Sequence, residues 1–141
     1  MERRDILMDQ IEQFSRALGT ILARFMGLKE DQNTQAAMAV VHQDLQTELN
    51  VDMEQLTRLE GKELTEYIGT LKLTAEHLDH LAKYLYEVGT LMKQEEQDQL
   101  AQLYFAAAKR LLDRAFEQST TIPFDRIYLK EKLEKELKKG L

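Results

Sequence analysis

The chain has no cysteine among its 141 residues, and it has only one proline, Pro123. The absence of cysteine excludes disulfide bonds, thiolate catalysis and metal sites with cysteine ligands. The six glycines stand singly, so no glycine-rich phosphate-binding loop is present. The two serines, Ser15 and Ser119, lack the flanking glycines of a nucleophile elbow. Nucleophilic catalysis therefore has few residues to draw on.

The chain also lacks long hydrophobic runs. No apolar stretch approaches the roughly 18 residues that a membrane-spanning helix needs. The beginning, "MERRDILMDQ", has neither the apolar core nor the small-residue cleavage site of a secretory signal. We therefore expect a cytoplasmic protein that does not bind membranes.

Positive charge is scarce in the middle of the chain. The net charge is −6, and residues 29–124 hold nine basic and seventeen acidic side chains. Nucleic-acid affinity comes largely from cations that neutralise phosphates, so we expect no nucleic-acid partner. The C-terminal stretch "LKEKLEKELKK" alternates charges, which is typical of a solvent-exposed helix with ion pairs one turn apart.

What the sequence does contain is apolar residues at helical spacing throughout, with no strand-length stretch of alternating polarity. This pattern predicts an all-α fold in a single domain over residues 1–141, built as a helical bundle of four long helices and two short ones. Gly27 is predicted to end the first helix in a left-handed conformation. The segments with helical pattern are residues 5–26, 34–49 (capped by Asn33 or Thr34 and ended by Asn50), 52–73 (two short helices around Gly61), 74–92, 96–116 and 123–139.

The first helix carries one apolar stripe at alternating steps of four and three residues. Such a stripe is the inner face of a bundle helix, and it is equally the seam of a coiled coil. Two hypotheses therefore stand side by side: burial within the monomer, or a homodimer through this helix. The stripe consists of Leu7, Ile11, Phe14, Leu18, Ile21, Phe25 and Leu28.

The stretch "TAEHLDHLAK" has the spacing of a metal site, because His77 and His80 lie three residues apart on one helix. A zinc site needs a third protein ligand, and no His-Glu-x-x-His motif is present. The alternative interpretation is structural, with His77 in the buried row of Tyr84 and His80 on the polar flank. We expect no cofactor. The competing hypothesis is a metal-dependent helical enzyme that uses both histidines.

Residues 85–113 resemble the tetratricopeptide repeat, a helical hairpin. Leu85 stands where that repeat has an aromatic residue, and Asp113 stands where it has proline. Glycine and alanines are small at the point where the two helices of such a hairpin cross, and an aromatic side chain fills the space between them. The matching positions are Val88, Gly89 and Met92 in the first helix, and Ala101, Phe105 and Ala108 in the second.

The whole chain resembles a bacterial family of small all-helical proteins that is catalogued as a domain of unknown function. The resemblance lies in "RDILMDQIEQFSRALGTILA", in "LQTELNVDMEQL" and in the hairpin that follows. It implies a small helical fold, and it implies no activity or ligand.

In a tetratricopeptide scaffold, the first helix of each unit lines a concave groove that receives a peptide. The resemblance implies that Lys83, Tyr86, Thr90 and Lys93 face such a groove. The alternative is that they are ordinary solvent-exposed positions on a bundle helix. We therefore expect a protein-interaction or assembly module, with a protein or peptide partner and without catalytic activity.

Overall fold

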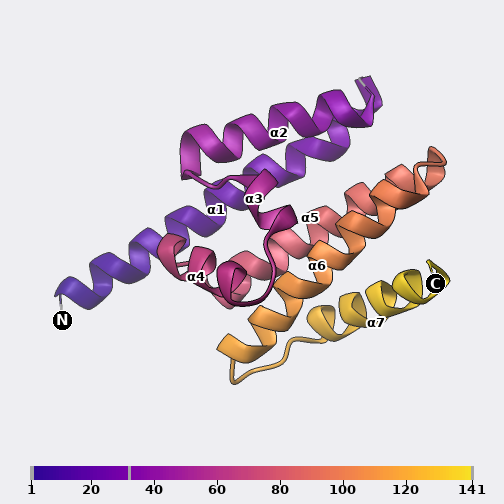
Figure 1. Cartoon of the computed structure of the whole chain (residues 1–141). Coiled ribbons are helices and arrows are strands. Elements are labelled where there is room, and N and C mark those ends of the chain that lie inside the picture. The colour runs from indigo at the N-terminus through magenta and orange to yellow at the C-terminus, as the bar shows by residue number, and fades with distance from the viewer. Residues whose placement is uncertain (1, 32, 141) are drawn as a thin grey trace. The chain divides into compact units, whose positions relative to one another are not determined.

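The computed structural model describes residues 2–31 and 33–140, with side chains from residue 8 onward. All regular structure in these ranges is helical, which confirms the predicted all-α class. Five of the seven helices found there have 16 or more residues, so the predicted count of four long helices was one too few, although the five longer segments with helical pattern correspond to these five helices. They are α1 (Glu2–Asp31), α2 (Thr34–Leu49), α3 (Met53–Arg58), α4 (Gly61–Leu71), α5 (Ala75–Gln94), α6 (Asp98–Gln118) and α7 (Phe124–Lys139) (Figure 1).

The helices α1 and α2 form one compact unit, and α3 to α7 form a second. In the first unit, Asn33 caps α2 by accepting a hydrogen bond from the Ala36 amide at 2.7 Å. Asn50 ends α2 in the left-handed conformation, with φ of 58°. Both predicted boundaries of α2 are confirmed, because asparagine suits the cap position and tolerates positive φ. Arg24 pairs with Asp44 at 3.3 Å across the two helices.

Gly27 does not end α1, so that prediction was wrong. The helix continues to Asp31, and among the described glycines only Gly61 has a positive φ. A glycine inside a helix costs about 1 kcal/mol relative to alanine, which a 30-residue helix tolerates. The continued turn places Leu28 in a half-buried position. Glycine is compatible with a helix end without requiring one.

Replacing Gly27 by alanine is expected to raise the free energy of unfolding by about 0.5–1 kcal/mol, because a Cβ there meets no atom within 4 Å and alanine favours the helix. The matched control is Gly61→Ala, where φ is +59°. Left-handed backbone costs a residue with a Cβ about 1–2 kcal/mol, so this variant should lose stability. Urea unfolding of both variants checks the pair. A loss of stability for Gly27→Ala would place Gly27 at a helix end after all.

The apolar stripe of α1 is buried only in part. α2 has 16 residues and α1 has 30, so α2 is long enough to pair with about half of α1. Of its members, Leu18, Ile21 and Phe25 are buried, whereas Ile11 is 41% exposed. A homodimer through α1 stays a prediction.

In the second unit, the boundary between α5 and α6 differs from the predicted one. α6 begins at Asp98 rather than at Glu96. Glu96 has φ of 62°, and the Gln97 amide donates to the Met92 carbonyl at 2.8 Å, which is how a helix C-terminus closes. Glu96 therefore belongs to the end of α5. A left-handed glutamate has no sequence signal, because glycine is the usual residue there.

The helices α5 and α6 form an antiparallel hairpin with a close contact in the half nearer its connecting loop. Gly89 of α5 lies against the fully buried Phe105 of α6, and a Cβ on Gly89 would lie 2.6 Å from the Phe105 ring. The neighbouring residues Leu85, Met92 and Ala108 are also buried. The predicted small residues thus lie where the helices meet.

The helix α7 runs parallel to α5 and antiparallel to α6. On α5 and α7, Asp79 pairs with Arg126 and Lys93 pairs with Glu136, so residue numbers increase in the same direction. On α6, Gln102 donates to the carbonyl of Glu136. α7 begins one residue after Pro123, whose carbonyl accepts from the Arg126 amide at 3.1 Å. Figure 1 shows α7 returning alongside α6 after the connecting loop.

Candidate functional site

A groove of about 690 Å³ lies between the parallel helices α5 and α7. Ligand sites in proteins commonly enclose about 300–1,000 Å³. Its floor includes Leu112 of α6, and both walls carry charged and aromatic side chains. The wall residues are Glu76, Asp79, His80, Lys83, Tyr86 and Glu87 from α5, and Pro123, Asp125, Arg126, Tyr128, Leu129 and Lys132 from α7 and the residue before it.

One ion pair holds the two walls together. Arg126 donates to both carboxylate oxygens of Asp79, from Nε at 2.7 Å and from Nη2 at 2.8 Å. The Arg126 side chain is 3% exposed, and its guanidinium lies 5.4 Å from the centroid of the Phe116 ring. Bidentate geometry fixes both partners and makes the pair a structural clamp. Neither group is left to bind a ligand.

Lys83 and Tyr86, two of the four residues predicted to bind a partner, line this groove. The Tyr86 ring is half-buried and lies 5.8 Å from the Phe105 ring, centroid to centroid. From the opposite wall, the Lys132 ammonium lies 5.9 Å from the centroid of Tyr86. The Lys83 side chain is exposed. The end of the groove away from Pro123 thus combines an aromatic ring with two lysines.

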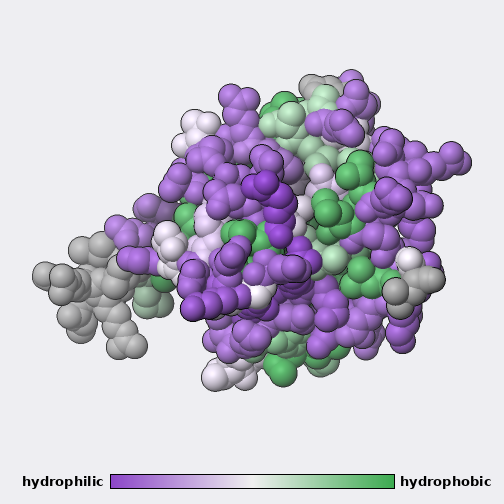
Figure 2. All heavy atoms as spheres, in the orientation of Figure 1, coloured by the Kyte–Doolittle hydropathy of each residue, from purple (hydrophilic) through white to green (hydrophobic). Residues whose placement is uncertain are grey.

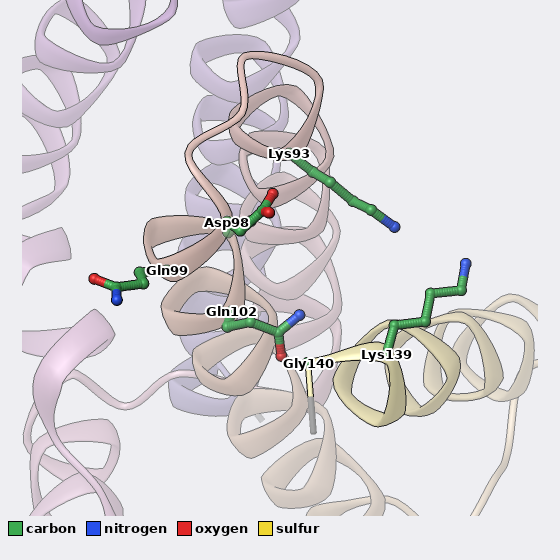
Figure 3. Close-up of a pocket in the computed structure, with 7 residues that line it drawn as sticks. Lys93, Asp98, Gln99, Gln102, Lys139 and Gly140 are labelled. Carbon is green, nitrogen blue, oxygen red and sulfur yellow. The ribbon is translucent and has the colours of Figure 1, made fainter.

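Lys93 lies at the other end of α5, in a second cavity of about 520 Å³ (Figure 3). Its ammonium lies 2.8 Å from Glu136, which also pairs with Lys139 at 3.4 Å. The hydrogen bond between Lys93 and Glu136 raises the pKa of Lys93 and lowers the pKa of Glu136. In Figure 3 the Gln102 carboxamide points to Gly140, and Gln99 points away from both. The two lysines of this cavity are balanced by Glu136 and by Asp98, which also lines it, so the cavity has no net positive charge for a ligand.

Thr90 lines neither of these two cavities in the described structure. Its hydroxyl donates to the Tyr86 carbonyl at 2.9 Å, one turn earlier in α5. A threonine hydroxyl in a helix commonly bonds in this way. The resemblance thus placed two of its four residues in the groove between α5 and α7.

The two histidines occupy different environments. His77 is 2% exposed, and its Nδ1 accepts a hydrogen bond from the Thr74 amide, while the Thr74 hydroxyl accepts from the His77 amide. This reciprocal capping fixes the start of α5, as the helical pattern predicted. The His80 ring lies in the groove, 3.9 Å from Glu76. In the described residues, no three histidine or acidic side chains are grouped so that they could hold a metal ion.

Sequence reasoning missed the second wall of the groove. Lys132 belongs to the stretch of alternating charges, which predicts a solvent-exposed helix, and Arg126 lies three residues before that stretch. One signal was present: Arg126 lies seven residues before Leu133, on the face that α7 buries. An arginine on the same face as a buried leucine indicates a pairing partner on another helix.

No family model, no curated protein and no solved structure matches the chain. Within the described ranges, the helices are too short or too polar to cross a membrane.

Proposed function

We propose that the chain is a non-catalytic protein-interaction module, and that the groove between α5 and α7 receives a segment of a partner protein. The observation that supports this most is the end of the groove away from Pro123, where Lys132 lies 5.9 Å from the centroid of the Tyr86 ring and Lys83 also lines the groove. Aromatic and cationic side chains in a concave site provide stacking area and charge for recognition.

The arrangement of α5, α6 and α7 supports a tetratricopeptide-like scaffold. In the hairpin of α5 and α6, Gly89 packs against Phe105. The helix α7 lies parallel to α5, as the first helix of a following repeat unit would. In that scaffold the groove is lined by successive first helices, here α5 and α7. The proposal therefore predicts that a partner contacts both helices.

Site-specific photo-cross-linking in a lysate of the native organism tests the proposed function. A photoreactive amino acid in place of Tyr128, which is 61% exposed and lines the groove, should capture peptides of a defined partner. Leu103 of α6, outside the groove and 45% exposed, is the matched control position. We expect capture at Tyr128 and not at Leu103, with loss of capture when Lys83→Glu is added.

The charge reversal at Lys83 is a suitable probe, because this side chain is exposed and its replacement leaves the core intact. Equal capture at both positions, or capture that survives Lys83→Glu, would contradict binding in the groove.

A further inference from the structure

An exposed apolar surface adjoins the groove at the start of α7. We call it the apolar lip: it consists of Ile122, Phe124, Ile127 and Tyr128, which are 57%, 79%, 37% and 61% exposed. Single exposed apolar residues are common on proteins, but a group of this kind marks an interaction surface. Figure 2 shows hydrophobic residues at the lower edge of this face, where Figure 1 shows the connection from α6 to α7.

The apolar lip is continuous with one end of the groove. Pro123 and Asp125 line the groove and lie in sequence between members of the lip, and Tyr128 belongs to both the lip and the groove. α7 buries its opposite face, where Leu133 is fully buried. A partner peptide that lies in the groove therefore contacts the apolar lip where it leaves the groove near Pro123.

Charge is unevenly placed along the groove. Near the lip, Glu76 and Asp125 are exposed carboxylates, while Asp79 is neutralised by Arg126. One to two turns further, Lys83 and Lys132 are opposed only by Glu87 among the charged side chains that line this part. A carboxylate of a partner is repelled near the lip and attracted near Tyr86.

The distance along α7 sets the spacing in the partner. Phe124 and Lys132 are eight residues apart on one helix, which corresponds to about 12 Å along the axis. An extended chain advances about 3.3 Å per residue, so about three to four residues span this distance.

On the basis of the proposed function, we infer that the partner segment is an extended peptide with an apolar side chain on the apolar lip and an aspartate or glutamate three to four residues away, held between Lys83 and Lys132. Burial of the apolar side chain on the lip provides affinity, and the ion pairs of the acidic residue fix the position of the peptide along the groove.

Selection from a displayed library of random 12-residue peptides on the purified full chain tests this inference. Enriched peptides should share an apolar residue and an acidic residue three or four positions apart. In binding assays by fluorescence anisotropy, replacing that acid by its amide, or introducing Phe124→Ser or Lys132→Glu, should each weaken binding about tenfold or more. Leu103→Ser, at a comparably exposed position of α6, should change affinity by less than about twofold.

The outcomes separate the two proposals. Enriched peptides that lose binding with Lys83→Glu but lack the paired apolar and acidic residues refute this inference and leave the proposed function standing. Peptides that bind equally to all groove variants, or no enrichment over a surface without protein, refute both.

Discussion

Replacement of Phe105 by alanine is expected to lower the free energy of unfolding by about 3–5 kcal/mol, the cost of removing a large aromatic side chain from a packed core. The Phe105 ring is fully buried and contacts Gly89, and it lies 5.8 Å from the Tyr86 ring. Small domains have about 5–15 kcal/mol of stability in total, so the variant should be marginally folded. Urea unfolding followed by circular dichroism measures the loss.

The partner substitution Gly89→Ala shows whether the ring contact causes the effect. In the native background, the added Cβ would lie 2.6 Å from a ring carbon, and such overpacking costs about 1–3 kcal/mol. In the Phe105→Ala background the ring is gone, so Gly89→Ala should stabilise the helix by up to about 1 kcal/mol. Additive effects of the two substitutions would contradict the contact.

Replacement of Asp79 by alanine is expected to lower the free energy of unfolding by about 3 kcal/mol, because it leaves the Arg126 guanidinium buried without a counter-charge. The Arg126 side chain is 3% exposed, whereas that of Asp79 is 29% exposed, so water replaces only part of the lost interaction. Hydrogen exchange should show the amides of α7 losing protection first, because Arg126 and Leu133 are the only buried side chains of that helix among its described residues.

The double variant Asp79→Ala, Arg126→Met is the control for the clamp. It removes both charges and keeps an apolar side chain at position 126, so it should recover most of the stability that Asp79→Ala loses. Lys62→Ala removes an ion pair whose side chains are 89% and 66% exposed, and it should change stability little. A double variant less stable than Asp79→Ala would show that Arg126 stabilises α7 without Asp79.

Most helix boundaries were predictable because they depend on residues close in sequence. Asn33, Asn50 and Thr74 cap helices through their own side chains or backbone conformation, and these preferences are local. The boundary at Glu96 was not predictable, because Glu96 has a left-handed backbone and glycine is the usual residue in that conformation. The prediction that Gly27 ends α1 was wrong because glycine permits a helix end without requiring one.

The groove was predictable on one wall only. Lys83 and Tyr86, which the resemblance assigned to a partner-binding groove, both line the groove between α5 and α7, and their role in binding stays a prediction. The position of α7, which forms the other wall, depends on the ion pairs that join it to α5. Lys93 pairs with Glu136, 43 residues away, and Arg126 pairs with Asp79, 47 residues away. Charge spacing in the sequence shows local partners and does not show these distant ones.

The central claim is that a partner segment binds along α5 and α7. The most direct measurement is a nuclear magnetic resonance titration of the isotopically labelled full chain with a peptide obtained by the library selection. We predict that chemical-shift changes concentrate at Lys83, Tyr86, Tyr128 and Lys132, with little change from Met8 to Phe25. Changes concentrated on α3 and α4, or no saturable change at all, would contradict the claim.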